Sequence, residues 1–257
     1  MTIAWNNYLE LPETALDGRR IPKTAIVAHA ALSKKQQKTL GNLRELHSFA
    51  TLAKSNTGIP AHVDEDHDIQ AVLYLSCLLN SWQRTNDIVT ILHRTFPNPT
   101  VLLIEVDEPG NRSMVSVGLK RKSLAEESAV VLERVETIEL PRSSSEDAMP
   151  FWQTFRYPQL SQHDLLDFVT AMQDAVLFAD ARSFLGFIPQ SDGIQRAVMR
   201  QELLQFKRLD REIVDLQSRR RNKDLSIGES AEIRVLEASK KEEAQILVDH
   251  IKELCHD

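Results

Sequence analysis

The amino-acid sequence predicts an α+β fold in which a mainly antiparallel sheet domain precedes a long helix and a C-terminal antiparallel helical hairpin. Apolar and β-branched runs of strand length recur between residues 43 and 140. One stretch with helical spacing interrupts these runs, which gives the order ββαβββ. From residue 196 onwards, apolar side chains recur at intervals of three and four, as on one face of a helix. A sheet followed by helices is typical of the α+β class.

The elements before the long helix follow one another along the first half of the chain. Residues 1–30 show no regular pattern, and the sequence predicts them to be irregular. Ser33 and Gln36 have the spacing of a capping box, which predicts the start of a short helix. Residues 43–54 fit either a strand or a helix, and we interpret them as a strand. Residues 71–79 form a continuous apolar run with the length of a buried strand.

A helix is predicted between the second and the third strand. Residues 83–95 carry Ile88, Ile91 and Leu92 at helical spacing. The pattern ends at residues 96–99, where two prolines stop a helix. A crossover helix is therefore expected at this point.

A β-hairpin is predicted after the proline break. The apolar residues 101–104 and the alternating residues 115–119 flank turn-forming residues at 107–111. Residues 129–140 contain many β-branched side chains but do not alternate cleanly. They predict a further strand, and the pattern does not decide which of its faces is buried.

The predicted organisation has four parts. Prolines at positions 141 and 150 favour a linker, and Asp164 before an apolar stripe favours the start of a helix that packs on the sheet. The parts are a sheet domain at residues 1–140, a linker at 141–160, a covering helix at 161–195 and a charged helical hairpin at 196–257.

The helical hairpin is the most distinctive part of the sequence. Residues 196–223 carry nine Lys and Arg against four acidic residues, whereas residues 224–257 carry four against nine. Ser226 and Glu229 have capping-box spacing and predict the start of the second helix. Opposite charge favours antiparallel pairing within one chain or exchange between two chains. Exposed ion pairs contribute only ~0 to 1 kcal/mol each, so packing along the apolar seam is expected to stabilise the pair.

The apolar seam of the hairpin is the predicted partner-binding site. Its residues share one face on each arm, although Lys240 interrupts the second arm. They are Phe206, Leu209, Ile213, Leu216, Leu236, Leu247, Ile251 and Leu254.

Two basic clusters supply an alternative, nucleic-acid-binding site. Clustered cations contact phosphate groups without needing a sequence code. For the cluster at the hairpin tip, a solvated helix end is the simpler interpretation, because cations favour the negative pole of the helix dipole. The net charge of -6 also argues against nucleic-acid binding. The clusters are Lys120, Arg121 and Lys122, and Arg219, Arg220, Arg221 and Lys223.

Composition limits the class of protein further. The chain has 257 residues, of which 42% are hydrophobic, enough for one substantial core and an appendage. It contains no apolar run long enough to span a membrane and no secretory leader, so we expect a cytoplasmic protein without a membrane partner. Cys77 lies in an apolar run and Cys255 near the end, which indicates two free thiols.

No motif in the sequence predicts a catalytic residue, a cofactor or a phosphate-binding loop. Residues 62–68 concentrate two histidines and four acidic residues, which are ligands that Zn²⁺ accepts. A polar run before an apolar strand is more typical of a solvated loop, and no further Cys/His cluster completes a ligand set. We therefore predict that the chain holds no metal.

A metal-dependent nuclease is a second alternative. Glu105 and Asp107 share one side of a predicted strand, and lysines follow on the next strand. If Asp107 pairs with Arg112, Lys120 falls opposite Pro99, about 20 Å from Glu105 at roughly 3.4 Å per residue. One metal site cannot span that distance, so acids that flank a turn are the favoured interpretation.

Four aromatic residues gather between positions 151 and 157. Such residues stack on single-stranded bases or form interface hot spots. They also suit a hinge that packs one domain on another, and we favour this internal hinge because Trp and Tyr combine an apolar body with a polar tip.

Several short motifs resemble a bacterial family called domain of unknown function 4391. They are the sequences Gly18-Arg19-Arg20-Ile21-Pro22-Lys23, Ser33-Lys34-Lys35, Phe96-Pro97-Asn98-Pro99-Thr100-Val101-Leu102-Leu103-Ile104 and Lys120-Arg121-Lys122. The resemblance runs from about residue 17 to the terminal hairpin. It implies an accessory protein encoded beside a DNA helicase and a DNA methyltransferase in bacterial defence clusters, and it supplies no catalytic residues.

The sequence and the resemblance together predict a non-catalytic accessory or assembly subunit of an antiviral, DNA-targeting complex. The subunit would associate through its C-terminal hairpin, as a homodimer or with a helicase or methyltransferase partner, and would contact DNA indirectly. A direct nucleic-acid binder or a cryptic metal-dependent nuclease is the alternative.

Overall fold

The computed structural model describes residues 4–107, 112–126, 129–140, 148–190, 193–221 and 225–255. The chain divides into two compact units, residues 1–176 and 177–257. The boundary lies within helix α7 (Leu165–Leu185), so one continuous helix contributes residues to both units. The predicted boundaries at residues 140, 160 and 195 stay predictions.

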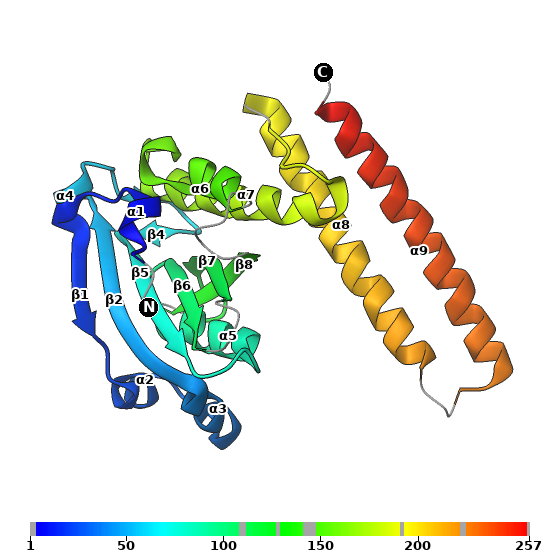
Figure 1. Ribbon diagram of the computed structural model, residues 1–257, viewed down its shortest axis with the longest axis horizontal. Coiled ribbons are helices and arrows are strands. Elements are labelled where there is room, and N and C mark those ends of the chain that lie inside the picture. Colours follow the sequence, from blue (N-terminus) through cyan, green and yellow to red (C-terminus); the bar gives the residue numbers. More distant parts are fainter. Residues whose placement is uncertain are drawn as a thin grey trace. The chain divides into compact units, whose positions relative to one another are not determined.

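A six-stranded sheet forms the centre of the first unit, with the strand order β1-β2-β5-β6-β7-β8 (Figure 1). Neighbouring strands are antiparallel except for β5 and β6, which are parallel. The mixed α+β class and the mainly antiparallel sheet are therefore confirmed. The strands are β1 (Leu16–Arg20), β2 (Leu43–Ala53), β5 (Ala71–Leu79), β6 (Thr100–Val106), β7 (Ser113–Lys122) and β8 (Val130–Leu140).

The N-terminal residues are not irregular, contrary to the sequence prediction. Strand β1 pairs antiparallel with β2 and forms an edge of the sheet, where its side chains are largely exposed. An exposed, charged strand at the edge of a sheet shows no alternation of apolar residues in its sequence. Its extended conformation comes from pairing with the neighbouring strand, so the sequence alone does not reveal it. A separate two-stranded sheet of β3 (His62–Val63) and β4 (Asp68–Ile69) was also not predicted. The order ββαβββ therefore omits β1, β3 and β4.

Helix α5 (Thr85–Thr95) connects the two parallel strands, which need a crossover connection. It packs on one face of the sheet together with the N-terminal helical segments. The buried residues of this layer include Leu75, Cys77 and Leu79 from β5, Leu102 and Ile104 from β6, and Ile88, Ile91 and Leu92 from α5.

The remaining helices before α6 are short. The predicted capping box is confirmed, because Ser33 Oγ accepts from Gln36 N and Gln36 Oε1 accepts from Ser33 N. These elements are α1 (Asn6–Leu9), α2 (Lys23–His29), α3 (Lys34–Thr39) and α4 (Lys54–Thr57), with 3-10 helices η1 (Glu13–Ala15) and η2 (Leu40–Asn42).

The other face of the sheet is covered by the first part of α7. Tyr74 Oη donates to Met172 Sδ over 3.0 Å. Gln173 Nε2 donates to the backbone oxygens of Val117 and Arg134, at 3.3 and 3.1 Å. Since Gln173 is fully buried, these bonds satisfy its amide and fix α7 against β7 and β8.

The aromatic cluster packs inside the first unit. Helix α6 (Met149–Phe155) buries Trp152 against Trp5 and Tyr8, with ring centroids 6.0 and 5.1 Å apart. The predicted hinge between domains is therefore wrong for Trp152, whose ring contacts join α6 to the N-terminal residues. In the predicted linker, residues 141–147 lie outside the described residues, and α6 and η3 (Tyr157–Gln159) follow.

Two helices of 28 residues each make up most of the second unit, namely α8 (Gly193–Arg220) and α9 (Ile227–Leu254). Ser226 and Glu229 form the predicted capping box at the start of α9. Figure 1 shows α8 and α9 side by side. Their cross-helix contacts run in opposite directions, since Arg220 pairs with Glu237 and Glu212 with Lys240. No helix in the described part of the chain is long and apolar enough to cross a membrane.

Candidate functional site: the C-terminal helix pair

The seam between α8 and α9 is built from apolar side chains at helical spacing. Leu209, Ile213 and Leu216 of α8 are at most 8% exposed, and Leu247 and Ile251 of α9 are 9% and 0% exposed. These positions recur every three or four residues, so each helix turns one stripe towards the other. The structure therefore brings most of the predicted partner-binding residues together, but it buries them within one chain.

The remaining predicted seam residues are placed less uniformly. Phe206 and Leu254 are partly buried against the same core. Leu236 is 48% exposed and does not belong to the seam, because the neighbouring Ile233 and Glu237 are buried in its place. Consecutive residues of an α-helix are rotated by about 100° around its axis. Leu236 therefore points to the side of the helix when Glu237 points into the seam.

Glu237 is an acidic side chain buried in the seam, with 4% of the side chain exposed. It accepts hydrogen bonds from Lys241 Nζ at 2.6 Å, Arg220 Nη1 at 2.7 Å and Gln217 Nε2 at 3.1 Å. The hydrogen bond from Lys241, with those groups of α8, lowers the pKa of Glu237 below its ordinary value. A carboxylate with three hydrogen-bond donors thereby occupies a seam position at which the helical pattern would otherwise place an apolar side chain.

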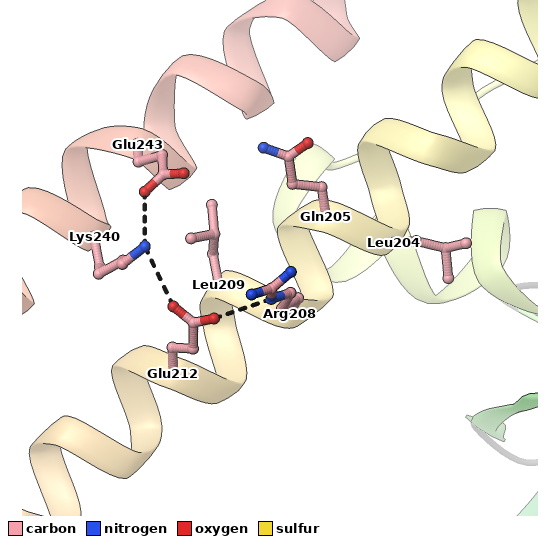
Figure 2. A pocket seen from close by; sticks show the side chains of 7 residues that line it. All are labelled: Leu204, Gln205, Arg208, Leu209, Glu212, Lys240 and Glu243. Carbon is pink, nitrogen blue, oxygen red and sulfur yellow. Dashed lines mark hydrogen bonds and ion pairs between the residues drawn. The ribbon is translucent and has the colours of Figure 1, made fainter.

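Lys240 does not break the seam, although its sequence position interrupts the apolar pattern. Its Nζ lies 3.3 Å from Glu212 Oε2 across the helix pair and 3.1 Å from Glu243 Oε2 (Figure 2). Arg208 Nε donates to the other oxygen of Glu212 over 3.1 Å. The four charged groups line an open pocket of about 510 Å³ with Leu204, Gln205 and Leu209. They satisfy one another, so the pocket presents no unpaired charge.

The first predicted basic cluster lies at the end of α8. Arg219, Arg220 and Arg221 are all exposed, and Arg220, whose side chain is 42% exposed, pairs with Glu237 of α9. Lys223 lies outside the described residues. Nucleic-acid binding through this cluster stays a prediction. Among the described residues, it would depend mainly on Arg219 and Arg221.

The second predicted basic cluster lies at the end of β7. Lys120 is only 4% exposed, and its Nζ donates to the backbone oxygen of His93. Burial lowers the pKa of Lys120 to about 8. Lys122 Nζ donates to the Asp64 backbone oxygen, and Arg121 Nη1 to the Lys122 oxygen. This placement argues against a phosphate contact by Lys120, because a buried ammonium cannot reach a ligand in solvent.

The predicted nuclease constellation is not assembled. Glu105 pairs with Ser113 in the register of β6 and β7, one position away from the predicted pairing of Asp107 with Arg112. Side chains alternate along a strand, so Lys120, seven residues after Ser113, faces the opposite side of the sheet from Glu105. The two side chains therefore cannot share one metal ion.

The outward side of α9 carries apolar residues that the sequence analysis did not select. Val235 is 71% exposed and Ile246 is 64% exposed. Eleven residues correspond to about three helical turns, so both lie on one face. Ala231 and Ala238, also exposed, share this face. We call Ala231, Val235, Ala238 and Ile246 the outer stripe of α9, which the exposed Glu242 on the same face interrupts. Its helical spacing is visible in the sequence, but the stronger seam pattern dominates it.

Comparison with known proteins identifies a family. The family model described as "Domain of unknown function (DUF4391)" matches residues 9–242, which include the whole sheet and the larger part of the helix pair. No curated protein and no solved structure matches the chain.

Proposed function

The chain belongs to the family of the domain of unknown function 4391, and on this premise we propose that it is a non-catalytic accessory subunit that assembles a protein complex through its C-terminal helix pair. The proposed partner is a DNA helicase or DNA methyltransferase of a bacterial defence cluster, the context that the family resemblance implies.

The observation that carries this proposal is the outer stripe of α9. The seam is occupied by α8, since Leu247 and Ile251 are almost fully buried. Val235 and Ile246 nevertheless expose most of their apolar surface on the same helix. A second apolar stripe on a long helix is typical of helices that pack on two neighbours, because each stripe buries against one of them. A helix of a partner protein is therefore the proposed occupant.

A catalytic function of this chain is less well supported. Glu105 and Lys120 face opposite sides of the sheet, and the charged groups of the open pocket neutralise one another. Direct DNA binding is also less well supported, since Arg220 and Lys120 are engaged within the protein. Both observations favour assembly over catalysis and over direct nucleic-acid contact.

Co-purification tests the proposal. The chain would be co-expressed with a tagged helicase or methyltransferase of the proposed defence cluster, and the tag would retain the wild-type chain. The double variant Val235→Asp with Ile246→Asp is expected to lose this retention while keeping its helical circular dichroism. Val214→Asp is the matched control, because Val214 is 57% exposed on α8. Retention of the double variant at the wild-type level would reject the outer stripe as the partner surface.

A further inference from the structure

The turn between β3 and β4 directs two imidazoles towards one carboxylate. His62 Nε2 lies 2.9 Å from Asp64 Oδ2, and His67 Nδ1 lies 3.3 Å from Asp64 Oδ1. One ligand atom from each of the three side chains lies within 4.8 Å of the other two. First-row divalent cations bind imidazole nitrogen and carboxylate oxygen at about 2.0 to 2.2 Å, so a single ion between these atoms would reach all three ligands after small side-chain movements.

Each imidazole is held from its other side by a second carboxylate. His62 Nδ1 lies 2.9 Å from Asp164 Oδ2, and His67 Nε2 lies 2.9 Å from Glu133 Oε2. In metal sites, a ligating histidine nearly always donates its second ring N–H to such a group, which fixes the ring and its tautomer. The two rings therefore have both the inner and the outer partners of metal ligands.

The Nδ1 atom of His67 is not used in a hydrogen bond within the described residues, and it is shielded from solvent. Its approach to Asp64 Oδ1 is an ion-pair distance without hydrogen-bond geometry. Buried ring nitrogens are normally satisfied, so this lone pair lacks the partner that a cation would provide.

The surrounding elements hold these groups in fixed positions. Asp164 directly precedes α7, and its Oδ1 accepts from Asp167 N over 2.8 Å. Glu133 is the extra residue of a β-bulge, because Leu119 pairs with Arg134 and Lys120 with Leu132. Bulges redirect a side chain out of the regular alternation, which aims Glu133 at His67.

The turn itself is attached to β7. Lys122 N donates to Asp66 O over 2.7 Å, and Lys122 Nζ donates to Asp64 O. Asp64 N also donates to His67 O over 3.0 Å and closes the turn. The two outer carboxylates, which lie far from the histidines in the sequence, are thus brought to them by the sheet, the bulge and the start of α7, all within the first unit.

We propose that His62 Nε2, His67 Nδ1 and the Asp64 carboxylate bind one divalent first-row transition cation such as Zn²⁺. Asp164 and Glu133 act as the outer carboxylates that orient the two rings. Two neutral imidazoles and one carboxylate leave a further coordination position to water. The set contains no sulfur ligand, so it selects a cation that accepts nitrogen and oxygen donors over Cu(I).

A neighbouring group does not make an equally good site. His163, Asp164 and Asp167 also have ligand atoms within 4.8 Å of one another. The His163 side chain is 81% exposed, and Asp164 Oδ2 already faces His62. His163 therefore serves as a matched control, since it is a nearby imidazole outside the proposed set.

Titration of the untagged, chelator-treated chain with zinc chloride tests the proposal. Isothermal calorimetry is expected to show saturable binding of one ion per chain, and zinc is expected to raise the Tm, because a ligand that binds only the folded state stabilises it. His67→Ala and Asp64→Asn are expected to lose both effects. Asp164→Asn and Glu133→Gln should weaken binding about 10-fold to 100-fold, as for other outer carboxylates.

Control variants make the result decisive. His163→Ala and Asp68→Asn should bind zinc as the wild-type chain does. If His67→Ala fails to fold, as judged by circular dichroism, the graded loss in Asp164→Asn and Glu133→Gln still reports the site. The proposal is overturned if the wild-type chain shows no saturable binding, in which case these contacts are ion pairs of protonated imidazoles. Unchanged binding in a folded His67→Ala chain, or its loss in His163→Ala, would also overturn it.

Discussion

Arg220 Nη1 of α8 donates a hydrogen bond to Glu237 Oε2 of α9 over 2.7 Å, which joins the basic helix to the acidic helix at the edge of their seam. Gln217 and Lys241 complete the hydrogen bonds of the same carboxylate. The opposite charge of the two helices therefore meets at a carboxylate that is itself shielded from solvent, although Arg220 and Lys241 are about half exposed. Exposed ion pairs elsewhere on the pair contribute little by comparison.

Acid is expected to destabilise the helix pair through Glu237. The folded-state pKa of Glu237 lies below its ordinary value of 4.5, so the unfolded chain binds the proton first as the pH falls. The stabilisation is present above pH 4.5 and is lost as the pH falls through the folded-state pKa. Thermal unfolding followed by circular dichroism, from neutral pH to below this range, measures the loss.

Two glutamine variants isolate this contribution. Glu237→Gln keeps the side-chain volume but removes the charge, and we expect a lower Tm at neutral pH and a shallower decline in acid. Glu232→Gln changes an exposed residue of the same helix and should follow the wild-type curve. If Glu237→Gln declines as steeply as the wild-type chain, another group controls the acid response.

Gly118→Ala is expected to destabilise the first unit. A Cβ at position 118 would lie 2.5 Å from His93 Nδ1, and His93 is fully buried between α5 and the sheet. The ring cannot move freely, since its Nε2 lies 2.8 Å from Ser116 Oγ. Overpacking of this kind costs about 1 to 3 kcal/mol, which denaturant unfolding would measure. Gly41→Ala is the control, because no atom outside residue 41 and its two chain neighbours lies within 4 Å of the added Cβ. A loss of the same size in both variants would refute the steric explanation.

Ile251→Ala and Ile246→Ala should separate the seam of α9 from its outer stripe. Ile251 is fully buried, so its truncation is expected to cost about 2 to 5 kcal/mol of unfolding free energy. Ile246 is 64% exposed, and its truncation should change stability by no more than about 0.5 kcal/mol. Chemical denaturation of both variants measures the difference. Equal costs would show that α9 packs with a different face.

The sequence predicts the strongly patterned elements of the fold and misses the weakly patterned ones. Residues 71–79 and the capping box at Ser226 carry local signals that survive in the structure. Strand β1 carries no such signal, because an exposed edge strand depends on β2 for its hydrogen bonds. The register of β6 and β7 was predicted one residue away from its actual position, since the sequence does not fix the geometry of the turn.

The two candidate sites differ in how far the sequence reveals them. The seam is a local pattern, so the sequence places most of its residues on one stripe that the structure buries, and it places Leu236 one position away from that stripe. Their role as a partner-binding site stays a prediction. The histidine and carboxylate cluster forms a polar run before an apolar strand in the sequence, which predicts a solvated loop, and its outer partners are distant in the chain. Asp164 follows His62 by 102 positions, and Glu133 follows His67 by 66. Only the fold brings these partners together.

Size-exclusion chromatography with light scattering tests the central claim, that the chain assembles with a protein through α9, most directly. The purified 29.2 kDa chain would be run alone, with the helicase or methyltransferase partner, and with a short DNA duplex at low salt. We predict a stable complex with the protein partner that Val235→Asp with Ile246→Asp abolishes, and no shift with DNA. A salt-sensitive shift with DNA, together with an unchanged mass in the presence of both proteins, would contradict the claim.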